Sequence, residues 1–93
     1  MSAIKVRVEY TKAQNVFLFF ELNGVFKRLI VATKQDNYKP KIISTAKDKE
    51  LLLANRLLEI IVDRGFIDKT IKEKKTKRYT IAKKELNLWF LRY

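Results

Sequence analysis

Residues 11–24 read TKAQNVFLFFELNG, and the interpretation of this stretch decides the fold. Thr11, with Gln14 three residues later, has the form of a helix capping box that precedes an apolar run. Gly24 is the residue type that most often ends a helix, because it adopts a left-handed backbone without strain. The pattern therefore predicts a helix over residues 12–23.

Extended segments are expected on both sides of this helix. Residues 25–33 (VFKRLIVAT) and residues 38–45 (YKPKIIST) are rich in β-branched or alternating apolar side chains and are separated by a polar turn, which predicts two paired strands. Residues 4–10 (IKVRVEY) also alternate, which predicts an extended arm or a short strand with Lys5 and Arg7 on one face.

The second half of the chain repeats this order of elements. The sequence TAKDKELLLANRLLEIIVDRG begins at Thr45, has a wide apolar stripe at helical spacing and ends at Gly65, which predicts a long helix. Residues 66–72 and 77–83 are expected to be strands, and the final residues a short helix. The predicted order is αββαββα, an α+β fold with a four-stranded antiparallel sheet in one domain over residues 1–93, with an arm or strand at 1–10 and the core at 11–93.

Charge is the strongest compositional signal. Among 93 residues, 21 Lys and Arg face 10 Asp and Glu, a formal net charge of +11, so a polyanion is the expected partner. Residues 68–84 alone hold eight Lys or Arg against two acids. The sequence has no cysteine and no histidine, which excludes disulfides, thiolate zinc sites and Ser-His catalysis. No uncharged stretch has the length of a membrane span, and no signal pattern opens the chain, so we expect no membrane partner and an intracellular location in the cytoplasm or nucleoid.

The segment VFLFFELNGVF at residues 16–26 resembles a degenerate LAGLIDADG motif, the signature of a family of homing endonucleases. The resemblance extends over residues 13–91. Four further blocks resemble the family's pattern in the same order: STAKDKELL (44–52), GFID (65–68), RYTI (78–81) and KKELNLWFL (83–91).

This resemblance implies an αββαββα saddle whose sheet lies in the major groove of double-stranded DNA, with the helices behind it and two chains forming a homodimer. The implied function is sequence-preferring binding of DNA. The residues expected to contact DNA are Lys27, Arg28, Thr33, Gln35, Lys39, Lys41, Lys69, Thr70, Lys72, Lys74, Lys75, Lys77, Arg78 and Thr80. Phe17, Phe20 and Gly24 are the expected dimer interface, and the aromatic cluster of Phe17, Phe19, Phe20 and Phe26 is assigned to the core or to that interface rather than to base stacking.

Cleavage is expected to be absent. Asn23 stands where the family has the acidic residue that binds the divalent metal, and an amide brings no charge to hold the ion or to activate its water. Glu21 occupies the family's first acidic place, so Asn23 and Glu21 are the candidate, degenerate catalytic pair. No cofactor is expected, and Mg²⁺ only if the chain is an active endonuclease.

Three alternatives remain open on the sequence. The chain is either a DNA-binding module, an active metal-dependent endonuclease, or an RNA-binding helper of the kind found among the family's relatives. A different fold also competes, because residues 57–84 resemble the recognition helix and wing of winged-helix transcription regulators, which bind DNA through a helix in the groove.

Overall fold

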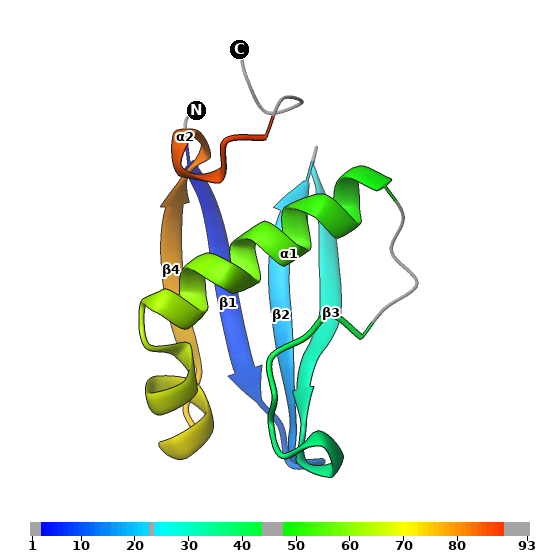
Figure 1. Cartoon of the computed structure of the whole chain (residues 1–93), viewed down its shortest axis with the longest axis vertical. Helices are drawn as coiled ribbons and strands as arrows, with labels where there is room; N and C mark the ends of the chain where they lie inside the picture. The colour runs from blue at the N-terminus through cyan, green and yellow to red at the C-terminus, as the bar shows by residue number, and fades with distance from the viewer. Residues whose placement is uncertain (1–2, 23, 44–47, 89–93) are drawn as a thin grey trace.

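A four-stranded antiparallel sheet and one long helix make up most of the chain in the computed structural model, which describes residues 3–22, 24–43 and 48–88 (Figure 1). Along the chain the elements are β1 (Ala3–Tyr10), β2 (Asn15–Leu22), β3 (Val25–Thr33), a 3₁₀ turn η1 (Lys34–Asp36), α1 (Asp48–Asp63), a π-helix η2 (Ile67–Lys72), β4 (Lys77–Ala82) and α2 (Lys83–Leu86). The strand order is β3-β2-β1-β4. The first strand, β1, therefore lies inside the sheet and pairs with the last strand, β4, which forms one edge. The predicted α+β class with a four-stranded antiparallel sheet is confirmed.

The core lies between the sheet and α1, which crosses the sheet diagonally (Figure 1). Alternate residues of each strand point to this side, as the pleat of a strand requires. The buried apolar side chains of the strands are Ile4, Val6 and Val8 of β1, Val16, Leu18 and Phe20 of β2, Leu29, Val31 and Ala32 of β3, and Tyr79 and Ile81 of β4. They meet Leu53, Ala54, Leu57, Leu58 and Ile61 of α1.

The helix predicted from residue 45 onward is confirmed as α1, Asp48–Asp63. Its buried positions recur at helical spacing, and acidic Asp48 and Glu50 lie in its first turn, where they interact favourably with the helix dipole. Gly65 follows with φ +89°. This left-handed conformation commonly ends helices, and glycine adopts it without the steric strain that a side chain would cause. The chain then turns so that Phe66 is fully buried.

The helix predicted over residues 12–23 is wrong, because this segment forms a turn and then β2. The Oγ1 atom of Thr11 accepts a hydrogen bond from the Asn15 N–H (3.3 Å), so Thr11 closes the β1–β2 hairpin instead of capping a helix. Gly24, with φ +80°, lies in the hairpin between β2 and β3. The signals at both ends were turn signals, and hairpins use the same residue types as helix ends.

Two other predicted strands are also corrected. Of the strand predicted over residues 38–45, residues 44 and 45 lie outside the described ranges, and residues 38–43 run beside β3 without forming a strand. The Lys41 N–H donates to the Val31 carbonyl (2.9 Å) and the Ile43 N–H to the Ile30 carbonyl (2.8 Å). In the strand predicted over residues 66–72, Phe66 precedes a π-helix and residues 67–72 form that helix, η2. The prediction was wrong because apolar residues four positions apart, which share one face of a helix, also fit the alternation of a strand.

The element order is therefore βββαβα, with the short η1 and η2 turns, and not αββαββα. The winged-helix alternative is wrong for a related reason: it needs two helices before residue 45, and the described residues there form three strands and one 3₁₀ turn. The alternation of residues 4–10 is confirmed as β1, a central strand of the sheet, and the predicted last strand is confirmed as β4. A short helix follows β4, but it covers Lys83–Leu86 and ends at Asn87, which has a left-handed backbone, so it begins and ends earlier than the helix expected over the final residues. Residues 89–93 of that prediction lie outside the described ranges. None of the helices in the described ranges is both long and apolar enough to cross a membrane.

Candidate nucleic-acid interface

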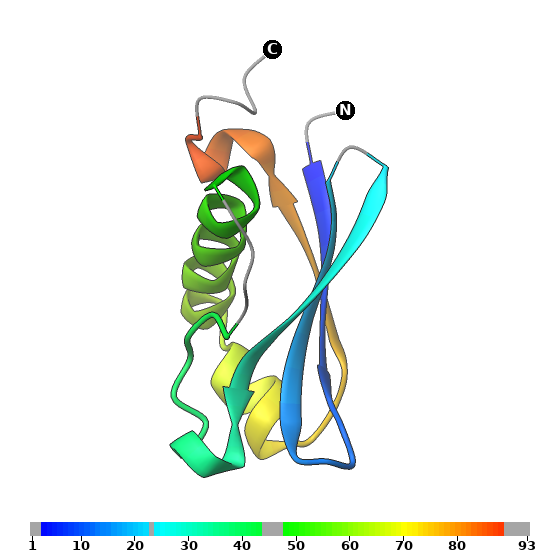
Figure 2. The ribbon, with the colours of Figure 1, turned by 90° about the vertical axis from the view of Figure 1, so that its right-hand side faces the viewer.

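One face of the sheet is left open by the helices. In Figure 2 the sheet is seen edge-on, and α1, η2 and α2 all lie on the same side of it. The residues that alternate with the buried ones must therefore point to the open side. We use the name open face for the side chains of Lys5, Arg7, Glu9, Phe17, Phe19, Glu21, Phe26, Arg28, Arg78 and Thr80, all of them exposed or half-buried.

Strand register places arginine and phenylalanine side by side across the centre of the open face. Phe19 of β2 is the register partner of Arg7 on one side and of Arg28 on the other, and Arg7 is also the partner of Arg78. The guanidinium carbon of Arg7 lies 4.4 Å from the centroid of the Phe19 ring, and that of Arg28 lies 5.0 Å from the Phe17 ring. Both distances are those of cation–π contacts, which hold the guanidinium planes against the rings.

Ion pairs are distributed unevenly between the two sides of the sheet. The five pairs away from the open face are Lys27–Glu50, Lys41–Asp36, Arg56–Glu59, Arg64–Glu85 and Lys72–Asp68. On the open face, Arg7 forms an ion pair with Glu9 at 2.7 Å, in a geometry that leaves Nε without a hydrogen bond. No carboxylate in the described ranges pairs with Lys5, Arg28 or Arg78. The open face thus presents cations that are free to neutralise an anion.

The open face contains a pocket of about 390 Å³. Its lining combines the side chains of Lys5, Arg7, Phe19, Phe26, Arg78 and Thr80 with parts of Val6 and Tyr79. Pockets that hold small ligands have volumes of roughly 300–1,000 Å³ and combine apolar walls with a few polar groups. Phe26 is the most exposed of the large apolar residues in the described ranges, with 74% of its surface accessible.

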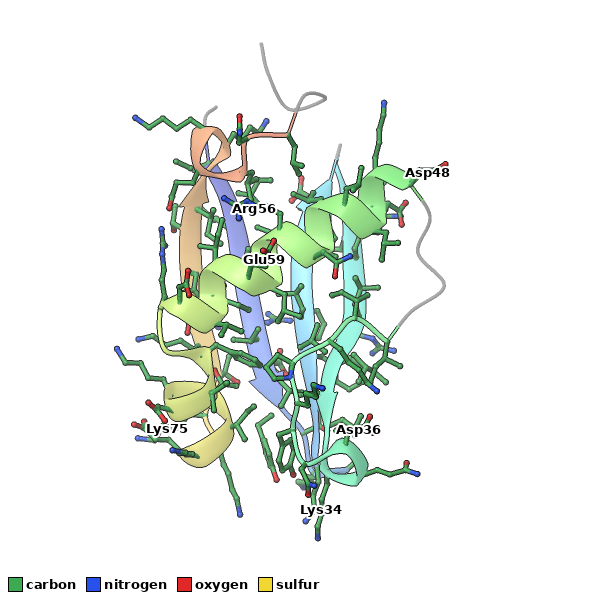
Figure 3. The ribbon with its side chains drawn as sticks, in the orientation of Figure 1. Lys34, Asp36, Asp48, Arg56, Glu59 and Lys75 are labelled. Atoms are coloured by element: carbon green, nitrogen blue, oxygen red, sulfur yellow. The ribbon has the colours of Figure 1, made fainter. Side chains whose placement is uncertain are left out.

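A second basic region lies at the end of the sheet that holds η1, η2 and the turn before β4. Lys75 and Lys34 mark this end in Figure 3. The hydroxyls of Tyr10 and Tyr38 lie 2.9 Å apart, and this hydrogen bond raises the pKa of Tyr38 to about 12. Lys74 Nζ lies 6.0 Å from the centroid of the Tyr10 ring. Basic side chains thus border a pair of tyrosines at this end.

The residues predicted to contact DNA, apart from Thr70, fall into four places. Arg28, Arg78 and Thr80 lie on the open face. Lys69, Lys72, Lys74 and Lys75 lie on η2 and the turn that follows, and Lys77 is the first residue of β4. Thr33, Gln35, Lys39 and Lys41 surround η1, where Thr33 Oγ1 accepts a hydrogen bond from Asp36 N–H and Lys41 lowers the pKa of Asp36 by pairing with it at 3.1 Å. Lys27 points to the helix side and pairs with Glu50 at 2.8 Å.

Two placements on β3 and η2 correct the expected register. Thr70 is fully buried and lies in the core, not on the surface. On β3, Leu29 and Val31 enter the core while Phe26 and Arg28 point outward. Phe26 is therefore not a core residue, although the assignment of the aromatic cluster allowed it to be one. Burial of apolar side chains fixes which face of a strand points inward.

The predicted dimer and catalytic residues are separated by the same alternation. Phe20 is 1% exposed and lies in the core, Phe17 is half-buried on the open face, and Gly24 is exposed in a hairpin turn. Glu21 is exposed on β2, and Asn23 lies outside the described residues. Within the described ranges, no group of three or more Asp, Glu, His or Cys side chains is placed to hold a metal ion.

Four open-face residues that line the pocket were not among the predicted DNA contacts: Lys5, Arg7, Phe19 and Phe26. The alternation of residues 4–10 already places Lys5 and Arg7 on one face, which was the available signal. For Phe19 the signal was hidden, because an apolar residue on the outer face makes β2 a continuous apolar run.

Comparison with protein-family models, with curated proteins and with solved structures finds no significant match for this chain.

Proposed function

We propose that this chain is a nucleic-acid-binding protein that contacts its target through the open face of the sheet and does not cut it. The observation that carries the proposal is the row of register partners Arg28, Phe19, Arg7 and Arg78. In this row the guanidinium groups of Arg28 and Arg78, which pair with no carboxylate of the described residues, share one uncovered surface with an aromatic ring and with Arg7, which pairs with Glu9. Lysine and arginine that neutralise phosphates release condensed counterions, and this supplies most of the affinity of basic proteins for nucleic acids.

The target expected from the sequence is double-stranded DNA. This chain would share one feature with a LAGLIDADG saddle, a four-stranded antiparallel sheet with the helices on one side. It differs in the segment that resembles the motif helix, which is a strand here. The proposal rests on the open face and not on that resemblance. Lysines of η2 and the following turn add phosphate contacts beside the sheet.

Binding without cleavage follows from the chemistry of the candidate catalytic pair. Asn23 supplies a neutral amide where a carboxylate would bind the metal, and Glu21 alone provides one charged ligand. We expect no Mg²⁺-dependent nicking of bound DNA by this protein. We expect none by an Asn23→Asp variant either, because the segment that resembles the motif helix is the strand β2 and the described residues contain no group of three carboxylates placed to hold the ion. Cut ends from either protein, on a gel of end-labelled duplex, would restore the endonuclease alternative.

The test of binding is fluorescence anisotropy with a labelled random-sequence duplex at a fixed salt concentration. Arg28→Ala combined with Arg78→Ala is expected to weaken binding at least tenfold. Lys49→Ala combined with Lys84→Ala is the matched control, since it removes the same charge from exposed positions on α1 and α2. Equal losses in the two double variants would show that net charge and not the open face determines binding.

The predicted homodimer cannot use all three of the residues expected at its interface. Phe20 is in the core, so of the predicted interface only Phe17 and Gly24 are accessible, and Phe17 belongs to the open face. We propose that the chain binds with this face uncovered, and that a dimer, if formed, uses the exposed β2–β3 hairpin. Sedimentation of the protein alone and bound to a duplex measures the stoichiometry.

A further inference from the structure

We infer that the pocket on the open face holds an unpaired nucleobase with its adjoining phosphate, so that single-stranded nucleic acid is bound in preference to a duplex. This inference rests on the proposed function and names the form of nucleic acid that the face recognises. It follows from three features of the pocket: an exposed aromatic ring, a pair of opposed arginines and an open but confined volume of about 390 Å³.

The exposed aromatic ring is that of Phe26. Its accessible fraction is 74%, although its neighbours on the same face, Phe17 and Phe19, are half-buried beneath arginine side chains. A ring in this position contributes little to the core, since it lies on the side of the sheet away from α1. Stacking on a base would remove it from water, and base–aromatic stacking is tolerant of sequence because every base has a π-face.

The opposed arginines are Arg7 and Arg78, which are register partners on β1 and β4 and both line the pocket. Like charges placed directly opposite each other across a strand pair are destabilising. An anion between them would relieve that repulsion, and a phosphate can accept parallel hydrogen bonds from a guanidinium group. Glu9 pairs with Arg7 alone, so the cost at Arg78 is not removed by any carboxylate of the described residues.

Together these groups fit one nucleotide of a strand whose bases are not paired. The phosphate would lie at Arg7 and Arg78, and the base would lie against Phe26 and the edge of Phe19. In a duplex the faces of the bases are covered by their neighbours, so a duplex presents phosphates to the arginines but no ring surface to Phe26. The pocket therefore favours the single strand through the aromatic contact and contributes to both forms through charge.

The experiment compares three labelled probes of equal length at one salt concentration: single-stranded DNA, single-stranded RNA of the same sequence, and the DNA duplex. Binding is measured for the wild type, for Phe26→Ala and for Val25→Ala. Val25 is the matched control, because it is an adjacent apolar residue with 53% of its surface exposed and it does not line the pocket. Both substituted side chains are exposed, so neither change is expected to unfold the protein.

The expected result is that either single strand binds at least tenfold more tightly than the duplex. Phe26→Ala should weaken single-strand binding by roughly five- to a hundredfold, the range for loss of one stacked base, and should change duplex binding less than twofold. Val25→Ala should change neither. The two single-stranded probes show whether the pocket prefers DNA or RNA. The inference is supported if either single strand binds more tightly than the duplex.

Duplex binding as tight as single-strand binding, or single-strand binding unchanged in Phe26→Ala, would overturn this inference and leave the proposed function standing. Failure of all three probes to bind would overturn both.

Discussion

Arg7 and Phe19 face each other across the β1–β2 pair, with the guanidinium carbon 4.4 Å from the ring centroid, on the side of the sheet that no helix of the described residues covers. A cation held against an aromatic ring on an uncovered surface contributes to binding more than to folding. Val6, which precedes Arg7 on β1, and Phe20, which follows Phe19 on β2, point to the opposite side of the sheet and lie in the core. Side chains on one side of these strands should therefore mainly stabilise the fold, and those on the other side should mainly bind the target. Substitutions on the two sides can test this.

Phe20→Ala should mainly lower stability, whereas Phe19→Ala should mainly weaken binding. Phe20 is fully buried, and its loss should cost about 3–5 kcal/mol of unfolding free energy. Phe19 is half-buried, and its loss should cost about 1 kcal/mol, the size of its contact with Arg7, while weakening nucleic-acid binding severalfold. Urea denaturation and anisotropy measure the two effects. A Phe19→Ala variant as unstable as Phe20→Ala would show that the open face is part of the core.

Arg78→Ala should weaken binding at least tenfold, and Lys41→Ala less than threefold. The sequence alone gives both residues the same expectation, but Lys41 pairs with Asp36 at 3.1 Å beside η1, whereas Arg78 lines the pocket. The affinities of the two variants for one probe, measured in parallel, test this. Equal losses would move the interface to include the η1 end of the sheet.

Affinity for a short single strand should fall steeply with salt. Lys5 and Arg28 should each neutralise one phosphate, and Arg7 and Arg78 share a third, so the slope of log affinity against log salt concentration should be about −2. Because Glu9 offsets the charge of Arg7, Arg78 supplies the net charge at the shared phosphate. Arg78→Ala should reduce the magnitude of this slope by about 0.7, whereas Phe26→Ala should leave it unchanged because it removes no charge. A titration between about 50 and 200 mM salt provides the slopes. A flat dependence would contradict the role given to these cations.

Stability should fall at acidic pH through Glu85. Its pKa is lowered from 4.5, first by the hydrogen bond from Ala82 N–H and then by Arg64, whose Nη2 lies 2.7 Å from Oε1. Because the folded state favours the ionised carboxyl, this stabilisation is complete above pH 4.5 and is lost as the pH falls through the lowered pKa.

Denaturation of Glu85→Gln at a series of pH values tests this expectation. The variant should be less stable than the wild type at neutral pH and should lose less stability on acidification. Glu59→Gln is the control, since Glu59 is exposed and its distance to Arg56 is 3.7 Å. If both variants follow the pH profile of the wild type, the pairing of Glu85 makes no contribution to folding.

The sequence predicted α1 and β1 correctly, because the spacing of their apolar residues fits only a helix or only a strand. The stripe from Leu53 to Ile61 faces a single core, and the alternation of residues 4–10 has polar side chains at every second position, so α1 and β1 could be predicted from the residues. The same was not true of β2. Phe17 and Phe19 replace the polar residues expected on its outer face, and the resulting apolar run has no visible period.

Charge, composition and the absence of cysteine and histidine are properties of the sequence alone. They indicate a polyanion partner and exclude disulfides, thiolate zinc sites and Ser-His catalysis. Tertiary structure decided which of the many basic residues share a surface. Arg7 and Arg78 are 71 positions apart in the chain and become partners only because β4 returns to pair with β1. Pairing between distant strands depends on how all the elements bury their apolar faces together, and no local pattern contains that information.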